Sequence, residues 1–143
     1  MKDTDISYIA GLFDGEGSID FKRRKEYRKN RKGEKYLSNV MNITMRIEMT
    51  HESILIWIKE KLKIGTVRKR NRSPSIKKHW KDRWTYTLRS RQAYHVCCLI
   101  WPYAHVKMPG IQKIIDHYSK IDGIVMNDKI VNLEEYKQRM TLE

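Results

Sequence analysis

Glu16 is the residue whose type and position suggest chemistry most strongly, because this acid stands between two glycines at the end of an apolar stretch. The apolar residues before it recur at helical spacing: Ile6, Ile9, Ala10 and Phe13. Thr4 is the expected N-cap of this helix, and Gly15 and Gly17 are expected to end it in the left-handed conformation. A carboxylate there adds to the partial negative charge of the free carbonyls. Glu16 and the backbone carbonyl of Gly15 are therefore candidate ligands of a divalent cation such as Mg²⁺, which prefers oxygen. A core helix followed by a solvated turn is the alternative.

A second face of the same predicted helix has almost no side chain. Ser7, Gly11 and Gly15 recur every four residues, so they lie above one another on a helix. A glycine inside a helix costs about 1 kcal/mol relative to alanine. Close packing against the backbone of another helix would offset that cost, so we expect this face to be a helix–helix interface.

The stretch from Ile9 to Gly17 resembles the nine-residue signature of the LAGLIDADG homing endonucleases. It reads Ile-Ala-Gly-Leu-Phe-Asp-Gly-Glu-Gly and fits the pattern position by position, with hydrophobic exchanges and a Glu for the last Asp. The resemblance implies an αββαββα core, in which a four-stranded antiparallel DNA-binding sheet packs against helices. Asp14 also lies in the signature, where we expect it to cap or hydrogen-bond structure and not to bind metal.

The sequence contains one copy of the signature, and the resemblance implies that such a chain pairs with a copy of itself about a two-fold axis. Ser7, Gly11 and Gly15 then form the dimer interface, and each Glu16 binds a metal beside one scissile phosphate. The implied activity is metal-dependent hydrolysis of both strands of a long, pseudo-palindromic DNA site, which leaves 3′ overhangs. Mg²⁺ is the expected cofactor, with Mn²⁺ or Ca²⁺ as substitutes for binding.

Lys107 is the second candidate catalytic residue. It follows the second long predicted helix closely, where the family often has a lysine near the active-site water. Its cation would polarise that water or stabilise the pentavalent phosphate. An ordinary surface lysine is the alternative. The five histidines of the chain show no zinc-ligand spacing.

The charge of the chain predicts an anionic polymer as partner. The net charge is +13 over 143 residues, a length typical of one domain, so we expect residues 1–143 to form a single domain. Residues 22–35 hold nine Lys/Arg and two Glu, and residues 68–83 hold eight Lys/Arg and one Asp. These two basic windows carry essentially the whole surplus, which excludes a uniformly basic surface.

The cysteines and the hydropathy indicate an intracellular protein without a membrane partner. Cys97 and Cys98 are adjacent, so they cannot build a disulfide framework, and they are expected in a buried helix. No apolar run is long enough to span a bilayer. These features do not distinguish a bacterial cytoplasm from a mitochondrion or chloroplast.

The periodicity of the chain predicts an α+β fold with one antiparallel sheet. Met41, Ile43, Met45, Ile47 and Met49 alternate with polar residues over the firmest strand of the four. The strands are expected to begin at 18, 36, 66 and 83, with a hairpin loop at 28–35 and a loop around Pro74. Further helices are expected at 52–62, 90–101, 109–121 and 133–140, the first capped by Thr50 and the second by Ser90.

The polar strand face predicts contacts to duplex DNA. A sheet bearing Arg, Thr, Asp and Glu fits a major groove, where arginine bonds guanine and carboxylates accept from cytosine. Lysines and arginines of the loops are expected to bind phosphates. The candidate DNA-binding residues are Asp20, Lys22, Arg24, Thr44, Arg46, Glu48, Thr66, Arg68, Arg70, Arg83, Thr85, Thr87 and Arg89. A merely solvated face is the alternative.

Two classes of function remain open at this point. The leading hypothesis is an intron- or intein-associated homing endonuclease acting as a homodimer. The alternative is a non-cleaving DNA-binding protein, or an RNA-splicing maturase of the same fold with RNA as its partner. The acid at Glu16 favours the enzyme, because a carboxylate near phosphates is repelled unless a metal intervenes.

Overall fold

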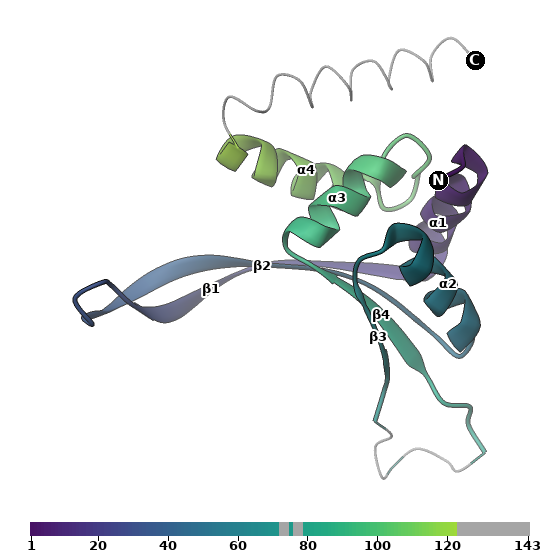
Figure 1. The fold of residues 1–143 in the computed structure, drawn as a ribbon, viewed down its shortest axis with the longest axis horizontal. Coiled ribbons are helices and arrows are strands. Elements are labelled where there is room, and N and C mark those ends of the chain that lie inside the picture. The colour runs from purple at the N-terminus through teal and green to yellow at the C-terminus, as the bar shows by residue number, and fades with distance from the viewer. Residues whose placement is uncertain (72–74, 76–78, 123–143) are drawn as a thin grey trace.

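A computed structural model describes residues 1–71, 75 and 79–122 of the chain (Figure 1). Its elements are α1 (Asp3–Glu16), β1 (Gly17–Lys29), β2 (Lys35–Met49), α2 (Glu52–Leu62), β3 (Thr66–Lys69), β4 (Trp84–Arg89), α3 (Arg91–Ile100) and α4 (Met108–Asp122). This order confirms the predicted α+β class. The helix expected at 133–140 and part of the loop around Pro74 lie outside the described residues.

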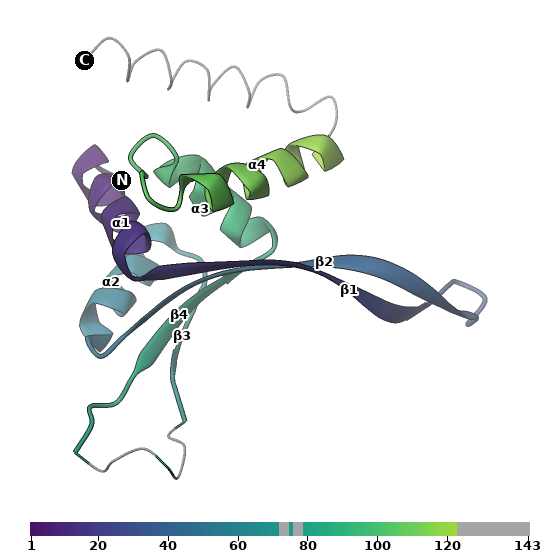
Figure 2. The same ribbon diagram turned by 180° about the vertical axis from the view of Figure 1, so that it is seen from behind.

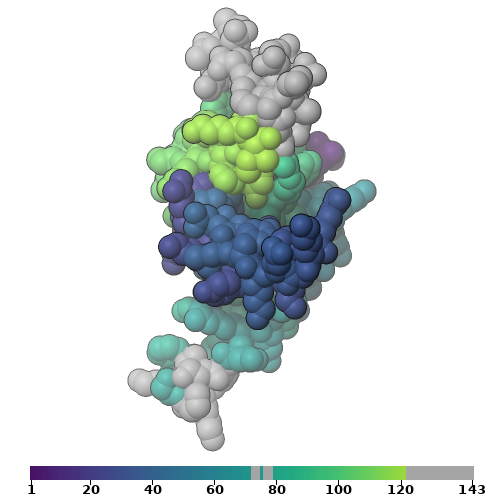
Figure 3. All heavy atoms as spheres, turned by 90° about the vertical axis from the view of Figure 1, so that its left-hand side faces the viewer, coloured from purple at the N-terminus to yellow at the C-terminus, as the bar shows by residue number. Residues whose placement is uncertain are grey.

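The four strands form one antiparallel sheet in the order β1-β2-β4-β3. The helices lie on one side of this sheet, and the two hairpins extend from it in different directions (Figures 1 and 2). In Figure 3 the blue β1–β2 hairpin lies below α4 and above the teal β3–β4 hairpin. The sheet therefore has a helix-covered face and an opposite face between the two hairpins.

The alternation predicted for β2 places its apolar residues under the helices. Ile43, Met45 and Ile47 are fully buried, because successive side chains of a strand point to opposite faces. Thr44 is 8% exposed although it lies on the polar face. It is paired with Asp20 on β1 and Arg89 on β4, and neighbouring strands cover it from both sides.

The core between the sheet and the helices joins residues from every helix. It contains Ile9 and Phe13 of α1, Leu55 and Ile58 of α2, Val96 and Ile100 of α3, and Ile111 and Ile114 of α4. Burying one such side chain fully contributes about 1.5–3 kcal/mol. Both cysteines lie on α3, where Cys97 is buried as expected and Cys98 is only half-buried. None of the helices in the described ranges combines the length and apolarity that crossing a bilayer requires.

The predicted helix caps make no side-chain capping hydrogen bonds. Thr4 is not the N-cap of α1, because the helix begins at Asp3 with Lys2 in the cap position. Thr50 is not the cap of α2, whose cap position is occupied by His51. Ser90 does precede α3, but its side chain makes no capping hydrogen bond. The starts of α1, α2 and α3 are therefore not fixed by a side-chain cap.

Gly17 ends α1 for a reason other than the predicted one. Its backbone is extended, with φ −79° and ψ 156°, so no left-handed residue is used. A Cβ built at Gly17 would lie 2.4 Å from the carbonyl oxygen of Phe13. The glycine therefore allows the chain to leave the helix and enter β1 without a connecting residue, which holds Glu16 at the start of the sheet.

Several element ends differ from the predicted ones by one or two residues. The loop expected at 28–35 is shorter, because β1 continues to Lys29 and β2 starts at Lys35. Asn30 stabilises this tight turn by accepting hydrogen bonds from the N–H groups of Lys32 (3.0 Å) and Glu34 (2.9 Å). The basic residues of this window thus sit on a long ribbon rather than in a loose loop.

Candidate functional site

The open face of the sheet forms a groove of about 790 Å³. All four strands and the last residue of α1 line it. Its lining residues are Glu16, Ser18, Asp20, Asn42, Thr44, Arg46, Glu48, Arg68, Lys69, Arg70, Thr85, Thr87 and Arg89. The groove is polar along its whole length, so it suits a polar, extended ligand.

The strand register explains why residues distant in sequence meet in this groove. Ser18 pairs with Arg46, which in turn pairs with Thr87 on β4. Directly paired residues of antiparallel strands project from the same face. The alternation on each strand therefore predicts most of the lining once the strand order is known.

Nine of the predicted DNA-binding residues line the groove, and four do not. Thr66 lies on the edge strand opposite Thr87, and Arg83 immediately precedes β4. Lys22 and Arg24 lie further along β1, towards the hairpin tip. These four residues are on or beside the hairpins that flank the groove.

Ser18, Asn42 and Lys69 line the groove although they are not among the predicted site residues. Ser18 and Asn42 occupy the same alternating positions as Asp20 and Thr44, so the strand pattern contained the signal. Lys69 lies out of phase with its neighbours in the sequence, and alternation gives no sign of it.

The groove is close to electrical balance. Five cationic and three acidic side chains line it, a surplus of two positive charges out of a net +13. Arg46 forms an ion pair with Asp20, and Arg70 forms one with Glu48. Exposed pairs of this kind contribute only about 0–1 kcal/mol to stability, so a ligand can exchange with them. Most of the positive surplus lies outside the groove.

Glu16 is exposed at the C-terminal end of α1, on the rim of the groove. The last turn of α1 contains no basic residue. Within the described part of the chain, no hydrogen bond or ion pair engages the Glu16 carboxylate. An exposed acid at the negatively polarised end of a helix is a candidate ligand for a cation.

Asp14 lies in the same turn but has quite different surroundings. Its carboxylate accepts hydrogen bonds from the backbone N–H groups of His105 (2.7 Å) and Lys107 (2.9 Å). Burial acts to raise the pKa of Asp14, but the backbone N–H groups of residues 105–107 and the charge of His105 outweigh it and hold the pKa below its usual value. The expected structural role of Asp14 is therefore confirmed.

The donors at Glu16 fit a hard divalent cation. In the described ranges, no three residues among His, Cys, Asp and Glu gather as a metal-binding group. One carboxylate and the carbonyl of Gly15 are oxygen donors of the kind that Mg²⁺ and Ca²⁺ prefer, and such ions complete their coordination with water and phosphate oxygens. A partial ligand set of this type suits a metal shared with a phosphate-bearing ligand.

Lys107 stands at the end of the connection between α3 and α4 and is half-buried. It is not one of the side chains that line the groove. Its backbone N–H is bound to Asp14, two residues before Glu16 on α1. The fold thus ties the backbone of Lys107 to Asp14, in the turn of α1 that ends at the candidate metal ligand Glu16.

The predicted helix interface is an open surface in the single chain. Ser7, Gly11 and Gly15 are all exposed on α1. Among the described residues, a Cβ added at Gly11 or Gly15 would meet no atom within 4 Å beyond its chain neighbours and the backbone of its own helix. This face is therefore free to receive another helix closely.

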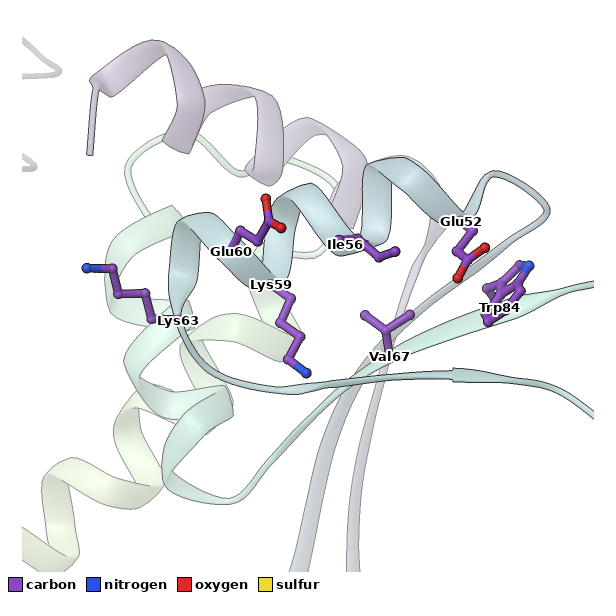
Figure 4. A pocket seen from close by; sticks show the side chains of 7 residues that line it. All are labelled: Glu52, Ile56, Lys59, Glu60, Lys63, Val67 and Trp84. Atoms are coloured by element: carbon purple, nitrogen blue, oxygen red, sulfur yellow. The ribbon is translucent and has the colours of Figure 1, made fainter.

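A second hollow, of about 460 Å³, lies between α2 and the β3–β4 hairpin (Figure 4). Its lining residues are Glu52, Ile56, Lys59, Glu60, Lys63, Val67 and Trp84. In Figure 4 the Trp84 ring lies beside Glu52, and Lys59 extends towards β3. Two acids and two lysines balance each other there, so the hollow favours no class of charged ligand.

A sequence profile described as LAGLIDADG endonuclease matches residues 9–89, more than half of the chain. The chain belongs to the LAGLIDADG endonuclease family. The match begins with the signature that ends at Gly17 and runs to the last residue of β4, so it includes the whole groove-forming sheet. The family predicted from the signature is thereby confirmed.

Solved structures of LAGLIDADG proteins share this fold. The homing endonuclease I-CvuI, in complex with the I-CreI target in the presence of 2 mM Mg, superposes with a TM-score of 0.64 at 16% identity, covering 98% of this chain and 82% of that one. The archaeal intron-encoded homing endonuclease I-Vdi141I, complexed with DNA, gives 0.58 at 16% identity, with 99% and 84% covered. The group I intron-encoded I-CeuI, complexed with DNA, gives 0.55 at 18% identity, with 93% and 60% covered.

At these identities the likeness establishes the fold alone. It confirms the predicted four-stranded antiparallel sheet packed against helices. A comparison with curated protein sequences gives no match.

Proposed function

We propose that this LAGLIDADG chain is a homodimeric, divalent-metal-dependent homing endonuclease that cuts duplex DNA. The observation that carries the proposal is the position of Glu16, whose exposed carboxylate lines a polar groove and has no partner among the described residues. A protein that only binds DNA gains nothing from an open acid at that place, because the acid repels phosphates.

The groove and its flanking hairpins divide the contacts to DNA between them. The near-balanced floor of Arg, Thr, Asp and Glu offers donors and acceptors to base edges in a major groove. The basic windows on the two hairpins supply charge to phosphates without reading sequence. That the related I-CvuI, I-Vdi141I and I-CeuI structures are complexes with DNA supports this assignment.

Glu16 and the carbonyl of Gly15 would hold the divalent metal beside a scissile phosphate. When bound, Mg²⁺ supplies Lewis-acid stabilisation of the phosphate and a more acidic water. The backbone of Lys107 is bound to Asp14 in the same turn, and its side-chain cation would stabilise charge that develops on the phosphate oxygens. Mn²⁺ and Ca²⁺ are expected to substitute for binding.

Two copies of the chain are needed to cut both strands, because each contributes one Glu16. The open face of Ser7, Gly11 and Gly15 supports a two-fold pairing of α1 helices. The proposed unit of this pairing is a single domain of residues 1–143. A two-fold dimer fits a pseudo-palindromic site. The cuts on the two strands would be staggered across the minor groove, which leaves 3′ overhangs. The proposed source of such a chain is a mobile intron or intein.

A cleavage screen against a randomised duplex library, with Mg²⁺ or with chelator, tests the proposal. The expected result is Mg²⁺-dependent double-strand cleavage at one long site by the wild type and none by Glu16→Gln. Binding of a duplex site without cleavage in any divalent metal would favour the non-cleaving binder. Preferential binding of structured RNA over every duplex would favour the maturase.

A further inference from the structure

The connection between α3 and α4 is held to the signature helix by one side chain. The Asp14 carboxylate accepts from the N–H of His105 at 2.7 Å and from the N–H of Lys107 at 2.9 Å. The bonded partners are 91 and 93 residues away in the chain. The contact is therefore a tertiary tether, and it does not belong to local helix capping.

The tether is built of charge-assisted bonds. Its two donors are backbone groups, whose positions define the course of the loop, and both oxygens of the carboxylate are used. Bonds from N–H groups to a carboxylate are about twice as strong as neutral ones. These bonds also offset the unfavourable interaction between Asp14 and the negative end of the α1 dipole, because the last turn of α1 contains no basic residue.

The two acids of this turn point in different directions because a helix advances about 100° per residue. Asp14 meets residues 105–107, whereas Glu16 stands on the rim of the groove. One rigid turn therefore connects the loop that carries Lys107 with the candidate metal ligand.

We propose that Asp14 is a positioning residue that fixes the loop of Lys107 against the turn of Glu16, so that both candidate catalytic groups of one chain move as a unit. This inference rests on the proposed endonuclease function and deepens it. Asp14 itself touches neither metal nor DNA in this role; it acts through the backbone of Lys107.

The primary test compares Asp14→Asn with wild type in single-turnover cleavage of the cognate duplex. The amide keeps the shape but replaces one acceptor oxygen with a donor that faces a backbone N–H. We expect the cleavage rate to fall about 10–100-fold, as for other residues that orient a catalytic group, with duplex affinity in Ca²⁺ unchanged. The matched control is Asp116→Asn, an exposed acid that accepts from Gln112 (2.8 Å) on its own helix and should leave the rate unchanged.

Amide hydrogen exchange reports the tether independently of activity. The N–H groups of His105 and Lys107 should exchange at least about tenfold faster in Asp14→Asn, because their acceptor is weakened. Unchanged exchange of both groups together with unchanged cleavage would overturn the proposal. Asp14→Glu, which keeps charge and both oxygens, should cut at a rate between those of wild type and Asp14→Asn; a rate below that of Asp14→Asn would also overturn it.

A double-mutant cycle separates positioning from general stability. If Asp14 acts through Lys107, Asp14→Asn should slow the Lys107→Ala enzyme by less than about twofold, because the group it positions is gone. Additive losses, or a Lys107→Ala enzyme that cuts like wild type, would overturn the inference while leaving metal-dependent cleavage by Glu16 intact. Failure of the proposed function is distinct, since the wild type itself would then cut no duplex.

Discussion

The last turn of α1 carries two acids with different surroundings: Asp14 faces the loop of residues 105–107, and Glu16 lines the groove. Asp14 has both carboxylate oxygens bound to backbone N–H groups, whereas Glu16 is exposed and unengaged within the described residues. Both acids face the same unfavourable helix end. The surroundings therefore divide the roles: the satisfied acid holds structure, and the unsatisfied one is available for a metal.

The largest expected effect comes from removing the charge on the groove side. Glu16→Gln keeps the size of the side chain and loses the metal ligand, so cleavage should fall on the order of 10³-fold or more. Duplex affinity without metal should stay within about threefold. Plasmid cleavage and fluorescence anisotropy on the same preparation measure the two quantities.

Asp14→Asn is the comparison variant for that experiment, because it also removes one negative charge from the same helix turn, two residues before Glu16. Its loss of cleavage should be clearly smaller than that of Glu16→Gln. Equal losses for the two variants would mean that the surroundings do not separate the roles of the two acids.

A smaller effect is expected at the open face of α1. Gly11→Leu adds a side chain at an exposed position where a Cβ meets no atom of another described element within 4 Å, so the monomer should fold normally. A close-packed helix pair has no room for this leucine. We therefore expect the dimer dissociation constant to rise about 10–100-fold, because overpacking costs about 1–3 kcal/mol. Sedimentation velocity over a concentration series measures this.

His95→Leu is the control for that variant, because it places leucine at an exposed position of α3. It should leave the dimer unchanged. A Gly11→Leu protein as dimeric as wild type would exclude α1 as the interface.

The sequence predicted the groove better than it predicted the turn that flanks it. The alternation over β2 placed Thr44 and Arg46 on one face correctly, because strand periodicity is local and the register follows from it. The partners of Asp14 could not be predicted, since no local pattern indicates which distant backbone groups will reach a carboxylate. Gly17 was assigned a left-handed role, but the requirement at that position is the 2.4 Å approach to Phe13, a contact that appears only in three dimensions.

Asp14 should also make the stability of the chain depend on pH. The pKa of Asp14 is lowered from its usual 3.8 in the folded chain, so the stabilisation it provides is present above that value and lost as the pH falls through the lower folded value. At neutral pH, Asp14→Asn should cost about 1–2 kcal/mol of unfolding free energy, as expected for hydrogen bonds to a partly exposed charged group.

Urea unfolding of wild type and Asp14→Asn at neutral pH and at decreasing acid pH measures this difference. The difference in unfolding free energy between wild type and Asp14→Asn should become smaller as Asp14 protonates. If this difference stays constant down to the lowest pH at which both proteins fold, the charge of Asp14 does not stabilise the tether.

The smallest expected effect concerns an acid that is paired inside the groove. Asp20 forms an ion pair with Arg46, and together they offer an acceptor and a donor pair that match one G·C base pair in the major groove. Asp20→Asn should free Arg46 to bind any phosphate or acceptor. Because exposed ion pairs are worth up to about 1 kcal/mol, the affinity for random duplex should rise about 2–5-fold. The preference for G·C at one target position should weaken.

Glu26→Gln is the matched control, because Glu26 pairs with Arg24 outside the groove lining and should leave base preference unchanged. Selection from a randomised target library with each variant would reveal the shift, and an unchanged base preference for Asp20→Asn would show that the paired acid takes no part in reading the site.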